Sequence, residues 1–181
     1  MIGTLLHWFY CLPLGWVVAL PLILTAVFLV VRSKFQKYII WHVVVAAALV
    51  GWLTICLYVT VGNRESGGGY HNNYLPFHSY RELFAGGDIE ILRSNLMNLV
   101  LFFPGGLLLI SAVPEKQRKI GNVLIILGIF LAFSAAIEAV QYFFAMGRFQ
   151  TDDLIHNFLG SALGVLLGLI RLKLKFKLSF K

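Results

Sequence analysis

Charged residues and cysteines are both scarce in this sequence. Only 13% of the 181 residues are charged, whereas an average soluble domain has about 25%. With 59% hydrophobic residues and a mean hydropathy of +0.83, the chain has too many apolar side chains for a water-exposed surface. The two cysteines, Cys11 and Cys56, both lie in apolar runs and indicate packing rather than a redox compartment. The composition predicts a single integral membrane domain over residues 1–181.

Metal-binding and nucleophile motifs are also absent from the sequence. It has no HExxH, no CxxC and no pair of histidines at helical spacing. One weaker combination would join Asp152, Asp153 and His156 with His71 or His78. Because this combination matches no known metal-binding motif, we expect no metal and no cofactor.

The net charge of +7 does not form a nucleic-acid-binding patch, because the basic residues flank apolar segments. No charged segment precedes the first apolar run, so a cleaved signal peptide is not expected. Five runs are long enough to cross a bilayer. The predicted spans are Trp8 to Val31, Ile39 to Val61, Asn95 to Val113, Ile120 to Phe144 and Leu154 to Leu172. The sequence thus predicts an all-α, multi-pass membrane bundle.

The distribution of Lys and Arg predicts the orientation of this bundle. Eleven of the fifteen Lys and Arg residues lie on one predicted side of the membrane, in the turns after the first and third spans and in the C-terminal segment. The other four lie on the opposite side. The positive-inside rule then places the N-terminus outside and the basic tail, residues 173–181, in the cytoplasm. Gly62 to Leu92 forms a long polar connection with a short interfacial helix from Ser79 to Phe84. Pro104 to Gly106 should break or bend the third span.

Polar side chains from three separate segments should meet near the outer ends of these spans. Glu138 and Gln141 are three residues apart and so share a helix face. Ionisable groups at membrane depth are rare and usually functional. Because an ionised carboxylate would be costly there, Glu138 is expected to be either protonated or paired, and Arg93 and Arg148 are the candidate partners. The candidate ligand-binding residues are Arg93, Asn95, Asn98, Glu138, Gln141, Arg148, Asp152, Asp153 and Asn157.

A stripe of glycines follows the polar residues of the last span, on the same helix face. Gly160, Gly164 and Gly168 recur every four residues, which predicts close packing on a neighbouring helix. In a purely structural interpretation, the polar groups hold the helices together and bind no ligand. Interhelical polar contacts in membranes average about 0.6 kcal/mol, so that reading gives a weak reason for so many polar groups.

Four pieces of the chain, in order, resemble the VanZ-like family of bacterial membrane proteins. They are NNYLPF (72–77), NLMNLVLFFPGG (95–106), IEAVQ (137–141) and, after Arg148, DDLIHNFLGSALG (152–164). The resemblance covers a core of about residues 72–168. It implies a plasma-membrane protein linked to resistance to glycopeptide antibiotics of the teicoplanin type. An acidic residue expected shortly after Arg148 is missing, which leaves open whether Asp152 takes its role.

Three functions remain open from the sequence. The first is binding of an amphiphile, namely a lipid, a lipid-linked cell-wall precursor or the lipoglycopeptide antibiotic. Arg148 and Arg93 would meet its phosphate or carboxylate, and Asn98, Gln141 and Asn157 would hold other headgroup atoms. The second is an intramembrane enzyme that uses Glu138 and Asp153 as acid and base on a lipid-linked substrate. The third is a structural or assembly partner without a ligand, for which the glycine stripe is a candidate interface. The oligomeric state does not follow from the sequence.

Overall fold

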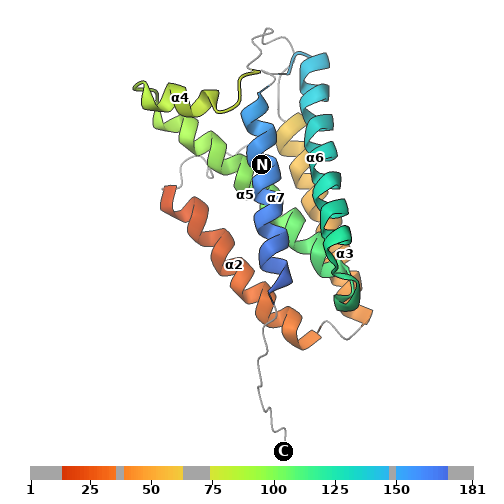
Figure 1. Ribbon diagram of the computed structural model, residues 1–181. Coiled ribbons are helices and arrows are strands. Elements are labelled where there is room, and N and C mark those ends of the chain that lie inside the picture. Colours follow the sequence, from red (N-terminus) through yellow and green to blue (C-terminus); the bar gives the residue numbers. More distant parts are fainter. Residues whose placement is uncertain (1–13, 36–38, 63–73, 147–149, 171–181) are drawn as a thin grey trace, which may run out of the picture.

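The computed structural model describes residues 14–35, 39–62, 74–146 and 150–170, which form helices and no strand. Arg148 and the basic tail, two features of the sequence-based predictions, lie outside these residues. The helices are α2 (Leu14–Phe35), α3 (Ile39–Leu57), α4 (His78–Phe84), α5 (Ile89–Ala112), α6 (Ile120–Phe143) and α7 (Thr151–Leu169) (Figure 1). A π-helical turn, Tyr58–Gly62, continues α3, and a 3-10 turn, Glu115–Gln117, precedes α6.

Three helices of the described chain are long and apolar enough to cross a membrane. They are α3 with its π turn (Ile39–Gly62), α5 and α6, each 24 residues long. The apolar part of α2, Pro21–Arg32, is shorter. The first two turns of α7 carry five acidic or polar side chains, at Thr151, Asp152, Asp153, His156 and Asn157. Exposed Val, Ile and Leu side chains cover the outer faces of α3 and α6, as expected of helices surrounded by lipid. The prediction of an all-α membrane bundle is confirmed at this level.

The third predicted span is longer than expected. Its helix, α5, begins at Ile89 rather than Asn95, because the Asp88 carboxylate accepts a hydrogen bond from the Glu90 backbone N–H at 3.2 Å and caps the first turn. The helix is also continuous through Pro104, so of the two predicted outcomes, a break or a bend, the break does not occur. Asn95 and Asn98 consequently lie inside α5 rather than at its start.

The bundle is built on the close pair formed by α5 and α7, which cross in Figure 1. A Cβ atom on Gly160 would overlap the Leu99 backbone, and one on Gly164 would overlap that of Phe103. On the facing helix, a Cβ on Gly106 would overlap the Ser161 carbonyl. Glycines on both helices therefore permit backbone contact. The main core cluster lies beside this pair and comprises Cys56, Phe102, Ile110, Ile126, Phe130, Ile137 and Val165.

The two ends of the bundle differ in their polar contacts. One end of the bundle contains α4, the last turn of α6 and the first turn of α7 (Figure 1), and we call it the α4 end. At the opposite end, the buried Arg32 of α2 donates from Nη1 to the Gly168 carbonyl of α7 at 2.5 Å and to Ser111 Oγ of α5 at 3.4 Å. Arg32 thus joins three helices and caps the last turn of α7.

Candidate functional site

Asp152, in the first turn of α7, binds the start of α4. Phe77 precedes α4 in the left-handed region (φ 61°), and the side chain of Phe77 caps no backbone group. Instead, the Asp152 carboxylate accepts the N–H of Phe77 at 2.5 Å and the N–H of Ser79 at 2.7 Å. Ser79 Oγ–H donates to the same carboxylate at 2.6 Å. A distant carboxylate therefore caps this short helix, and each such charge-assisted bond contributes about 1.5–3 kcal/mol.

Further hydrogen bonds extend this contact to α5 and along α7. Asn95 Nδ2 donates to Ser79 Oγ at 3.0 Å. His156 Nδ1 lies 2.6 Å from the Asp152 carbonyl, and its Nε2 lies 2.8 Å from the Tyr80 hydroxyl. Because a carbonyl only accepts, Nδ1 carries a proton, and in the neutral ring the Tyr80 hydroxyl donates to Nε2. These bonds fix α4 on the ends of α5 and α7.

A second set of polar contacts joins α7 to α5 and α6 deeper in the bundle. Asn98 Nδ2 of α5 donates to Asp153 Oδ1 at 2.7 Å. One turn further along α7, Asn157 Nδ2 donates to Ser134 Oγ of α6 at 2.9 Å. Glu138 lies one turn beyond Ser134, is 1% exposed, and accepts the backbone N–H of Gln150 at 3.2 Å. Polar residues of three helices therefore meet inside the bundle.

Gln141 extends this set to the end of α3. Its Nε2 donates to the Thr60 carbonyl at 2.7 Å, on the π turn. We call the six residues that make these deeper contacts the polar cluster: Asn98, Ser134, Glu138, Gln141, Asp153 and Asn157.

Two side-chain oxygens of the polar cluster are buried and receive no hydrogen bond from the part of the chain that the structure describes. Gln141 is 1% exposed and Asn157 is 3% exposed, and Gln141 Oε1 and Asn157 Oδ1 have no partner within the described ranges. The Gln141 amide cannot be reversed, because Thr60 offers a carbonyl that needs its N–H. Reversing the Asn157 amide would only exchange which of its atoms is unpaired. Each unpaired group costs about 1–3 kcal/mol.

The remaining predicted residues fall outside the polar cluster. Asn95 and Asp152 hold α4 in place. Arg93 Nε lies 3.6 Å from Glu90 Oε1, one turn back on its own helix. Arg148, the other predicted partner of Glu138, is outside the described residues.

Several residues that make these contacts were not predicted from the sequence. Ser134 lies four residues before Glu138 and therefore on the same face of α6, a signal that was available. The hydrogen bonds of Ser79, Tyr80 and Thr60 join segments far apart in the chain, and no local pattern indicates them.

Comparison with known protein families assigns the chain to one of them. The VanZ/LLP1 family model matches residues 7–172. The chain belongs to the VanZ/LLP1 family. The matched residues run from before α2 to the end of α7, so they contain both sets of polar contacts.

Membership in the VanZ/LLP1 family, together with the apolar helices, supports a VanZ-like membrane protein linked to antibiotic resistance. Neither curated proteins nor solved structures yielded a match to this chain.

Proposed function

We propose that this VanZ/LLP1 protein binds an amphiphile whose polar head enters the polar cluster from the outer leaflet. The amphiphile would be a membrane lipid, a lipid-linked cell-wall component or a lipoglycopeptide antibiotic of the teicoplanin type. The observation that carries the proposal is the pair of unpaired buried oxygens, Gln141 Oε1 and Asn157 Oδ1. Unsatisfied groups of this kind are rare in native structures, and each calls for a partner or a functional explanation; we propose that the polar head supplies the partner.

The chemistry of the polar cluster selects the kind of head. The two unpaired groups among the described residues of the polar cluster, Gln141 Oε1 and Asn157 Oδ1, are both hydrogen-bond acceptors. A head that carries hydroxyl, ammonium or amide N–H groups would satisfy them. Each hydrogen bond to a previously unpaired oxygen recovers about 1–3 kcal/mol. On sequence grounds, Arg148 would meet a phosphate or carboxylate of the same molecule.

Binding of this kind gives a route to resistance. A protein that holds the lipid-linked target, or the lipid-bearing part of the antibiotic, would lower the amount of antibiotic that reaches its site of action at the cell surface. Such a role needs no chemical change in the ligand.

The test is teicoplanin susceptibility of a sensitive strain that expresses the protein. Asn157→Leu and Glu138→Gln should remove most of the protection at unchanged protein level, because the first removes an unpaired acceptor and the second replaces the buried carboxyl group of the polar cluster by an amide. Gly128→Ala, at a glycine of α6 with open space around it, is the control and should protect like the wild type. Full protection by both cluster variants would refute the proposal.

Two other functions make different predictions. An enzyme that uses Glu138 and Asp153 as acid and base would leave a new species in lipid extracts of expressing cells, and a binder would not. Assembly with another protein through the glycine stripe would require that stripe to be accessible. The stripe packs on α5 of the same chain, which favours the binding proposal.

A further inference from the structure

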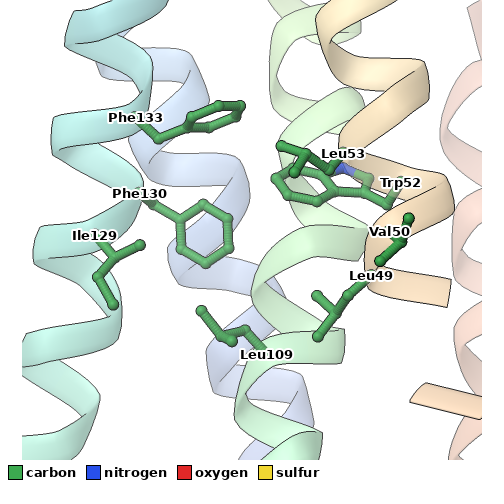
Figure 2. A pocket seen from close by; sticks show the side chains of 8 residues that line it. All are labelled: Leu49, Val50, Trp52, Leu53, Leu109, Ile129, Phe130 and Phe133. Atoms are coloured by element: carbon green, nitrogen blue, oxygen red, sulfur yellow. The ribbon is translucent and has the colours of Figure 1, made fainter. Parts of the chain in front are cut away.

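An apolar groove lies between α3 and α6, away from the polar cluster. Figure 2 shows side chains of α3 and α6 facing each other across it, with Leu109 of α5 between them. Its volume is about 310 Å³, and only apolar parts of the side chains face it. The lining residues are Leu49, Val50, Trp52, Leu53, Leu109, Ile129, Phe130 and Phe133.

The deep wall of the groove is held in a fixed shape. Trp52 Nε1 donates to the Leu101 carbonyl of α5 at 2.7 Å. The Trp52 ring also meets Phe130 edge-on, with ring centroids 5.7 Å apart, and lies 6.0 Å from the Phe133 ring. Gly105 provides the space for the indole, because a Cβ at this position would lie about 2.5 Å from it. The wall of the groove is therefore held by contacts within the protein, and a wall of fixed shape lowers the entropic cost of filling the groove.

The size and lining of the groove restrict what can fill it. Water needs polar partners, and apolar cavities stay dry. A thin, unbranched apolar chain can lie along a groove of about 310 Å³ that has no polar group on its walls. Val50 and Ile129 at the rim are 66% and 51% exposed, so the groove opens sideways to the surroundings of the bundle. In a membrane these surroundings are hydrocarbon chains.

We propose that this groove binds an acyl chain of the amphiphile whose head enters the polar cluster. Thr60, which bonds Gln141, lies eight residues after Trp52 on the same face of the α3 segment. At 1.5 Å per residue the two levels are about 12 Å apart along the bundle. A lipid with its head at the α4 end therefore has the middle of its chain at the groove. This inference rests on the proposed function for the position of the head.

The experiment is photolabelling of the full-length protein in phosphatidylglycerol vesicles that contain a phosphatidylglycerol with a diazirine on one acyl chain. Labelled residues are mapped by mass spectrometry of peptides. The groove residues Leu49, Leu53 and Ile129 should be labelled at least threefold more than Val44 and Ile125, which are exposed on the same two helices outside the groove. A bound chain stays near the groove residues longer than bulk lipid stays near the others.

Two substitutions separate a bound chain from general lipid contact. Ile129→Trp fills the groove and should reduce labelling of Leu49 and Leu53 to the level of Val44. Ile125→Trp, the same change one turn away, should leave their labelling unchanged. Equal labelling of groove and reference residues in the wild type would overturn the proposal. Labelling of the groove below the reference would also overturn it, and would indicate a second copy of the chain there.

The same experiment keeps this proposal distinct from the proposed function. Groove labelling that persists in Asn157→Leu at the wild-type level would support the acyl-chain site and contradict binding of the head in the polar cluster. Loss of teicoplanin protection in Asn157→Leu together with no preferential groove labelling would support the polar cluster and refute the acyl-chain site.

Discussion

Replacing Gly164 by alanine should drive α5 and α7 apart. The new Cβ would lie 2.7 Å from the Leu107 backbone nitrogen and closer still to the Phe103 carbonyl, where ordinary contacts are 3.4–4 Å. Both neighbours are backbone atoms and cannot rotate away, so the helices must separate by roughly 1 Å, at a cost of about 1–3 kcal/mol. Alanine also favours the helix over glycine by about 1 kcal/mol, which partly offsets this cost.

Gly128→Ala isolates the packing cost, because Gly128 lies within α6 and a Cβ added there would have nothing within 4 Å. The helix-propensity gain is common to both variants, so the difference between their unfolding free energies should be the overpacking cost, about 1–3 kcal/mol. Reversible unfolding in mixed detergent micelles, followed by circular dichroism, measures both. Equal stability of Gly164→Ala and Gly128→Ala would refute the backbone contact between α5 and α7.

Three further substitutions test individual contacts. Asp152→Asn should speed hydrogen exchange of the α4 amides about tenfold or more, because an amide cannot accept every bond that the carboxylate accepts. Asp88→Asn is the control, since asparagine can still accept the single capping bond at the start of α5, and it should leave exchange of the α4 amides unchanged. Unchanged exchange in Asp152→Asn would contradict the capping of α4. Trp52→Phe keeps a ring but loses the bond to the Leu101 carbonyl, and should lower the unfolding free energy by about 1 kcal/mol in the same micelle assay; an unchanged value would count against that bond. Arg32→Met leaves the Gly168 carbonyl without its buried donor and should cost about 1–3 kcal/mol; a more stable variant would show that the buried cation is a net burden.

Helical periodicity explains what could be predicted of the candidate site. Glu138 and Gln141 had to share a face of one helix, and Asp153 and Asn157 a face of another, because both pairs have helical spacing. The structure places these four residues inside the bundle at the α4 end. The start of α5 was also within reach of the sequence, since Asp88 before an apolar run is an N-cap signal.

Other features depend on contacts between distant segments and could not be predicted. Asp152 binds backbone N–H groups near residue 78, and no local pattern pairs a carboxylate with a turn more than 70 positions away. Pro104 and Gly105 suggested a broken or bent helix. In the structure Gly105 makes space for Trp52, and the indole, which is hydrogen-bonded to α5, forms part of the groove wall.

The most direct measurement of the central claim is an experimental density map of the protein in lipid nanodiscs at the level of Gln141 and Asn157. The proposal predicts density not due to the protein within hydrogen-bond distance of Gln141 Oε1 or Asn157 Oδ1, continuing toward the outer leaflet. A map in which both oxygens accept hydrogen bonds from protein groups, with no space beside them, would contradict it.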